Sequence, residues 1–156
     1  MLRINWQFFV TSLLNQTHLT MILTQLNYLS VAVSALAYFM LGAIYFNPKV
    51  VGTAWMKGHQ LGNPTEEDKK GVPKLMAMTF VLCFIACIAL GCLVKIMVPG
   101  NLFVGAKLGA LASVFPCMSI AMSYMYTRKS FQLIIIDSGY HVIGLIVAGV
   151  IQTAWL

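Results

Sequence analysis

Four long apolar stretches constrain this chain more than any other feature of its sequence. Each is long enough to cross a bilayer as a helix, which takes about 20 mainly apolar residues. In lipid, every backbone polar group must be hydrogen-bonded internally, which a helix achieves within its own segment. The sequence therefore predicts an all-α fold, an integral membrane bundle of four transmembrane helices. The spans cover about residues 27–46, 75–98, 104–127 and 131–156.

Composition excludes the other broad classes of protein. Of 156 residues, 60% are apolar and 9% are charged, whereas soluble domains average about 45–50% and about 25%. A soluble globule of this size would need more polar side chains to cover its surface, and disordered chains are poor in apolar residues. At this length the chain is expected to form one domain.

The first 20 residues lie outside the apolar pattern. Arg3 is followed by apolar residues, as in a signal peptide, but polar residues at 15–18 interrupt the run and no clear cleavage site follows. We divide the chain into an extension at 1–20 and a membrane domain at 21–156. Two alternatives stay open for the extension: a short helix lying at the membrane interface, or a segment that is not native because Met21 is the physiological start. Residues 1–20 are expected to be dispensable.

Positive charge is unevenly distributed between the connections of the spans. The 47–74 loop and the 128–130 turn carry seven Lys and Arg residues, whereas the N-terminus and the 95–107 connection carry three. Short cytoplasmic loops are enriched in Lys and Arg, so the 47–74 loop is predicted to be cytoplasmic and both termini to lie outside. Trp55 in this loop is predicted to anchor the chain at the membrane interface.

The same loop carries local signals. Thr65 followed by three acidic residues predicts the N-terminal cap of a helix. Gly71 and Pro73 predict that this turn ends before the second span begins. His59 has no evident partner and is expected to be solvated.

The fourth span carries the sharpest signal for a site. Asp137 and His141 are four residues apart, so they share one face of a helix, and ionisable groups at such depth usually face a bundle interior or a wet cavity. Both side chains are therefore expected to face protein. Two interpretations stay open: a hydrogen-bonded pair that fixes helix register, which we favour, and a proton-responsive or ligand-binding pair.

The first span carries a matching polar stripe. Asn27, Ser34, Tyr38 and Tyr45 recur at helical spacing within a narrow arc, which predicts that this face meets the other helices. Tyr38 lies at about the depth of His141, so its hydroxyl is the expected partner of that imidazole. The candidate intramembrane polar site consists of Asp137, His141, Tyr140, Tyr38 and Ser34.

Small residues predict where helices pack closely. Gly105, Gly109 and Ser113 recur every four residues along the third span, and Gly144 and Ala148 do so on the fourth. Small residues at this spacing let two helix backbones approach each other in a membrane. We expect a close helix contact at Gly109.

Several of these pieces together resemble one family. They are the end of the first span at 42–48, the Gly-x-Ala-Trp-Met-Lys segment at 52–57, and Gly-Tyr-His at 139–141. Over about residues 27–156 the chain resembles the bacterial four-helix membrane proteins catalogued as domain of unknown function 1761. The resemblance implies four helices in a bacterial inner membrane and implies no activity. Family members tend to have Asn near the position of Asp137, so this acid departs from their pattern.

No motif indicates catalysis, a cofactor or a metal. The four cysteines include no Cys-x-x-Cys pair, and phosphate-cradling loops, nucleophile elbows and zinc-binding helix motifs are absent from the sequence. The net charge of +6 comes from residues at the ends of apolar runs, without an Arg-rich, aromatic-containing stretch. Nucleic acid is therefore not an expected partner.

The expected function is that of a small non-enzymatic membrane protein. In the lipid bilayer it would act by helix packing, either with itself as a homo-oligomer or with a larger membrane partner. The alternative is an oligomeric proton-coupled transporter or permeation subunit that uses Asp137 and His141. A water-filled cavity that reaches His141 would favour transport, and a dry packed bundle would favour the packing role; an intramembrane enzyme ranks last.

Overall fold

A computed structural model describes residues 16–62, 65–97 and 101–155 of the chain. Among them, four helices are long and apolar enough to cross a membrane, which confirms the predicted all-α fold. They are α3 (Tyr28–Tyr45), α5 (Glu66–Met97), α6 (Leu102–Tyr126) and α7 (Phe131–Ala154). The shorter elements are α2 (Gln16–Thr24), η1 (Pro48–Gly52) and α4 (Thr53–His59).

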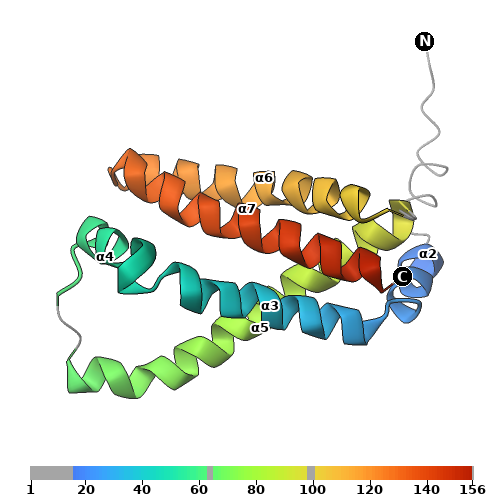
Figure 1. Cartoon of the computed structure of the whole chain (residues 1–156), viewed down its shortest axis with the longest axis horizontal. Coiled ribbons are helices and arrows are strands. Elements are labelled where there is room, and N and C mark those ends of the chain that lie inside the picture. The colour runs from blue at the N-terminus through green and yellow to red at the C-terminus, as the bar shows by residue number, and fades with distance from the viewer. Residues whose placement is uncertain (1–15, 63–64, 98–100, 156) are drawn as a thin grey trace, which may run out of the picture.

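Helix α7 is the centre of the bundle. It packs along α6 as an antiparallel neighbour and also contacts α3, α4 and α5. In Figure 1, α4 lies at the end of the bundle where α6 turns into α7, while α2 and the C-terminus lie at the other end. Fully buried side chains from three helices meet along this axis, among them Ala35 of α3, Cys87 of α5 and Ala148 of α7.

Glycines allow α6 and α7 to approach closely. A Cβ atom added to Gly109 would lie 2.1 Å from the backbone oxygen of Leu145, and one added to Gly105 would lie 2.5 Å from that of Gly149. Such distances are far inside van der Waals contact, so a larger residue would force the helices apart. The expected close contact at Gly109 is confirmed.

The other predicted small residues also pack inside the bundle. Ser113 is buried, and its hydroxyl donates to the backbone oxygen of Ala110 at 2.6 Å. Gly144 faces the ring of Tyr38, which a Cβ atom would meet at 2.1 Å, and Ala148 is fully buried. The small-residue faces therefore hold α3, α6 and α7 together within one chain.

Helix α5 begins earlier than its apolar span. Thr65 and Asp68 form the predicted cap, because the Thr65 hydroxyl accepts from the Asp68 amide at 3.2 Å and donates to its carboxylate at 2.6 Å. The expectation that Gly71 and Pro73 would end this turn is wrong, since the helix continues through both. The described side chains from Asp68 to Met78 are exposed. Among the described residues, no packed neighbour therefore prevents the helix from adjusting its backbone around Pro73. Figure 1 shows this part of α5 diverging from α3.

The predicted boundary at 20/21 falls inside α2. This helix begins at Gln16 and contacts α5, so the polar residues at 16–18 do not interrupt the structure there. Residues 1–15, on which most of the interfacial-helix expectation rests, lie outside the described residues, as does Leu156 at the end of the fourth predicted span.

Candidate functional site

Tyr38 and His141 are joined across the bundle. The Tyr38 hydroxyl on α3 and the Nδ1 atom of His141 on α7 are hydrogen-bonded. Tyr38 is 3% exposed, and His141 is half-buried. The predicted contact between these two side chains is therefore present, and His141 faces protein rather than lipid.

Tyr140 extends this cluster toward α5. Its ring packs against that of Tyr38, with 5.1 Å between the ring centroids. Its hydroxyl donates to the Tyr38 backbone oxygen at 3.4 Å and lies 3.7 Å from the Cys83 sulfur. One group of polar side chains, all buried except the half-buried His141, thus connects α3, α5 and α7: Tyr38, Tyr140, His141 and Cys83.

Asp137 lies in a second cluster, one helical turn toward α4. Its Oδ1 atom accepts from the indole nitrogen of Trp55 at 2.9 Å, and its Oδ2 atom accepts from the Tyr124 hydroxyl at 2.6 Å. The Nε2 atom of His59 is 3.7 Å from Oδ2, and the Asp137 side chain is 13% exposed. Like His141, Asp137 faces protein, as predicted.

The loop residues Trp55 and His59 therefore belong to the bundle. The expectation that His59 is solvated is wrong, because its ring packs on Trp55 with 4.7 Å between centroids and its Nε2 atom lies 3.3 Å from the Tyr124 hydroxyl. The Trp55 ring also contacts Phe46, and its N–H points toward Asp137. Its role as an interface anchor stays a prediction.

The polar stripe of α3 meets α7 along its length, as predicted. Tyr45 donates to the backbone oxygen of Ile136 at 3.0 Å, and Asn27 donates to that of Trp155 at 3.1 Å. Ser34, however, does not join the Tyr38–His141 pair. Its hydroxyl accepts from the Nε2 atom of Gln152 at 2.8 Å, about one turn along α3 from Tyr38 and about three turns along α7 from His141.

The candidate site is thus three separate polar groups and not one. Within the described part of the chain, no hydrogen bond joins Asp137 to His141. Sequence reasoning missed Tyr124, His59 and Gln152, although a buried carboxylate requires donors and aromatic residues with a polar handle occur near that end of the bundle. Gln152, a polar residue within the apolar fourth span, was a comparable signal for a buried hydrogen-bonded side chain.

A groove between α5 and α6 leads to His141. It has a volume of about 450 Å³. Its walls are mainly apolar, and its rim includes Leu82 of α5 and Phe115 of α6, which are 65% and 78% exposed. Tyr38, Tyr140 and His141 line its inner side, so the groove connects the lipid-facing surface to the first polar cluster.

A second cavity lies between α3, α4 and α5. Its volume is about 560 Å³, and Phe46, Trp55 and Met76 are among its lining residues. Thr79 and Tyr140 line both this cavity and the groove. The two spaces are therefore neighbours that adjoin at Thr79 and Tyr140.

The polar groups do not converge as a metal site. In the described ranges, no group of three or more His, Cys, Asp and Glu side chains is placed to hold a metal ion. The cysteines at 83, 87 and 117 are buried, and the Cys117 sulfur donates to the backbone oxygen of Ser138 at 3.6 Å. These thiols pack between helices as small apolar residues do.

One protein family matches the chain, over residues 29–153. It is described as "Protein of unknown function (DUF1761)". The match covers all four apolar helices except the first residue of α3 and the last residue of α7. No curated protein and no solved structure matches the chain.

Proposed function

For this chain, which belongs to the DUF1761 family, we propose a non-enzymatic role in the membrane: it binds an apolar molecule with one polar group in the groove between α5 and α6. One observation carries the proposal. The groove joins an exposed apolar rim to the buried Tyr38 and Tyr140 and the half-buried His141. Ligand sites are typically apolar clefts with a few convergent polar groups.

The size of the groove supports a small molecule over a partner helix. Sites for small molecules occupy about 300–1,000 Å³, and this groove has about 450 Å³. A helix with its side chains is about 10–12 Å across, so a single turn of a partner helix already has about the volume of the whole groove. A single acyl-like chain, with its polar end toward His141, is the occupant that we propose.

The small-residue faces bear on self-association. Gly105, Gly109 and Gly144 already pack against other helices of the same chain, so these faces are not free for a second copy. A homo-oligomer or a larger membrane partner would have to contact the outer, lipid-facing side chains. We therefore rank ligand binding above helix packing with itself or with a partner.

Proton-coupled transport is the second candidate, favoured by one observation. The groove and the cavity beside α4 meet at Thr79 and Tyr140, close to the cluster that holds His141. If this role holds, His141→Gln folds normally and abolishes a pH-dependent flux in proteoliposomes. If His141 has a structural or binding role, His141→Phe lowers stability and there is no such flux to lose.

We also place the protein in a bacterial cytoplasmic membrane, with the 47–74 loop inside the cell and both termini outside. The uneven distribution of Lys and Arg between the connections supports this orientation. The lipid bilayer is then the source of the proposed ligand.

Photo-crosslinking tests the binding role. The purified protein in nanodiscs is exposed to a palmitic acid analogue that carries a diazirine, and labelled peptides are mapped by mass spectrometry. We expect labelling at groove residues such as Leu93 and Phe115 to exceed that at Phe131 and Ile135, which are exposed on α7 and outside the groove.

A groove-filling variant provides the matched comparison. Ala112→Phe adds a ring inside the groove and should reduce labelling there. Val114→Phe on the same helix adds a ring at an exposed position and should not reduce it. Equal labelling of all lipid-facing positions, unchanged by Ala112→Phe, would contradict the proposed function.

A further inference from the structure

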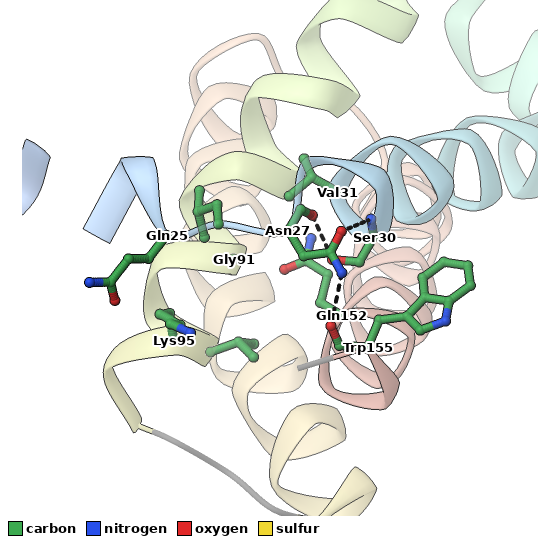
Figure 2. A pocket seen from close by; sticks show the side chains of 10 residues that line it. Gln25, Asn27, Ser30, Val31, Gly91, Lys95, Gln152 and Trp155 are labelled. Atoms are coloured by element: carbon green, nitrogen blue, oxygen red, sulfur yellow. Dashed lines mark hydrogen bonds between the residues drawn. The ribbon is translucent and has the colours of Figure 1, made fainter. Parts of the chain in front are cut away.

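A small pocket at the end of the bundle opposite α4 contains a buried acceptor without a partner. Gln152 of α7 is 3% exposed, and its Oε1 atom has no hydrogen-bond partner among the described residues. The pocket has a volume of about 170 Å³ and lies where α3, α5 and α7 meet the segment before α3 (Figure 2). Buried polar atoms are nearly always hydrogen-bonded, so this oxygen calls for a donor.

The orientation of the Gln152 amide is determined by its other contacts. Its Nε2 atom donates to the backbone oxygen of Cys87 at 2.8 Å and to the Ser34 hydroxyl at 2.8 Å. A carbonyl oxygen only accepts, so the atom beside Cys87 must be the nitrogen. Oε1 is therefore directed away from Cys87, toward the side where Gly91 lines the pocket.

Gly91 of α5 lies close to this oxygen. A Cβ atom added to Gly91 would lie 3.1 Å from Gln152 Oε1 and 3.3 Å from a methyl group of Leu26. In Figure 2 the Gln152 side chain lies beside the turn of α5 that contains Gly91. Because Gly91 has no side chain, no atom beyond its backbone separates this turn of α5 from Oε1 on the side of the pocket.

A cation lines the same pocket. Lys95 follows Gly91 by one turn on α5, and no described carboxylate pairs with it. Asn27 is already engaged, because its Oδ1 atom accepts from the Leu29 and Ser30 amides and its Nδ2 atom donates to the Trp155 backbone oxygen. Gln152 Oε1 thus offers an acceptor to a ligand and Lys95 a positive charge, and the Gln25 amide lines the same pocket.

We propose that this pocket binds a phosphoester that carries a hydrogen-bond donor next to its phosphate. The N–H or O–H group of the ligand donates to Gln152 Oε1, and its phosphate faces the Lys95 ammonium. The ethanolamine and glycerol headgroups of phospholipids have this chemistry. A choline headgroup has the same phosphate, but its quaternary nitrogen carries no N–H.

The position of the pocket favours a lipid over a soluble phosphoester. Lys95 lies near the end of α5, and Trp155 caps the end of α7. Lys and Trp are residues that gather at headgroup level in membranes. The pocket shares no lining residue with the groove between α5 and α6. The proposed headgroup site and the proposed ligand site in the groove can therefore be tested independently.

Native mass spectrometry of the purified full chain tests the site. It is titrated with phosphatidylethanolamine and with phosphatidylcholine of identical acyl chains, and separately with soluble O-phosphoethanolamine. We expect phosphatidylethanolamine to bind at least tenfold more tightly than phosphatidylcholine. Binding of O-phosphoethanolamine without lipid preference would support the same chemistry with a soluble source. Equal binding of the two lipids and no binding of O-phosphoethanolamine would overturn the proposal.

Substitutions at Gly91 locate the preference in this pocket. Gly91→Ala places a methyl group against Oε1 without touching the other Gln152 hydrogen bonds, and should abolish the preference for the ethanolamine headgroup. Gly91→Ser supplies its own hydroxyl to Oε1, and should abolish the preference while raising the melting temperature. Gly71→Ala is the control on the same helix, because a Cβ atom there meets nothing within 4 Å.

Lys95→Gln tests the phosphate contact. It should weaken binding of both lipids while their ratio stays in favour of phosphatidylethanolamine, because the donor contact at Gln152 is intact. A preference that survives in folded Gly91→Ala and Gly91→Ser proteins would overturn the assignment to this pocket.

Discussion

The indole nitrogen of Trp55 donates a 2.9 Å hydrogen bond to the carboxylate of Asp137. The bond ties α4, which follows the first span, to α7, the last helix of the chain. Tyr124 of α6 donates to the same carboxylate at 2.6 Å. One side chain thus holds together three elements at this end of the bundle, which gives Asp137 a structural role whatever else it does.

Removing the Trp55 donor should destabilise the protein. Trp55→Phe keeps an aromatic ring but leaves a nearly buried carboxylate oxygen without its partner, a loss of about 1–3 kcal/mol. Thermal unfolding in detergent measures the change. Trp155→Phe is the matched control, since that side chain is exposed, and its effect should stay within about 0.5 kcal/mol. Equal melting temperatures for the two variants would contradict the role of Asp137.

The Tyr38–His141 pair should show energetic coupling. Tyr38→Phe and His141→Phe each leave the other side chain unpaired, whereas the double variant removes both partners of the hydrogen bond. The double variant should therefore cost less than the sum of the single ones, by about 0.5–3 kcal/mol. Thermal melts of the four proteins measure this coupling, and additive effects would show that the contact contributes nothing to stability.

Gly109 should not tolerate even one added carbon. Gly109→Ala drives a methyl group against the Leu145 backbone, and such overpacking costs about 1–3 kcal/mol. Gly71→Ala on α5 meets nothing within 4 Å and should be neutral or stabilising, since Ala favours helices over Gly by about 1 kcal/mol. Gly109→Leu should cost more than Leu111→Ala, a change at an exposed position. A Gly109→Leu protein with the same melting temperature as the wild type would contradict the close contact.

The proposed orientation is testable by cysteine labelling. Gly62→Cys adds a thiol in the 47–74 loop, where a side chain meets nothing within 4 Å, and Asn101→Cys adds one at the start of α6. In a background without the native cysteines, a membrane-impermeant maleimide applied to intact cells should label the second thiol only. The parent protein without added cysteine is the control, and outside labelling of Gly62→Cys would reverse the orientation.

The sequence was sufficient for the features that depend on local pattern. The four spans follow from the length of the apolar runs, and the face of α3 that meets α7 follows from helical periodicity. The Tyr38–His141 contact could be predicted because both residues lie at similar depths on faces that had to point inward. The contact at Gly109 followed from small residues spaced by four. Each inference needs only the geometry of one helix and the high cost of exposing polar groups to lipid.

Only the tertiary structure decided which polar groups meet. Asp137 and His141 share a helix face, yet Asp137 binds Trp55 and Tyr124 while His141 binds Tyr38. Ser34, which was predicted to belong to the site around His141, is hydrogen-bonded to Gln152 instead. These pairings depend on how α4 folds back over the end of α7 and on how α5 packs against α3 and α7, and periodicity within one helix carries no information on either. The groove and the pocket beside the unpaired oxygen of Gln152 have the same cause. Both are spaces between helices, and packing over the whole bundle sets how those helices cross.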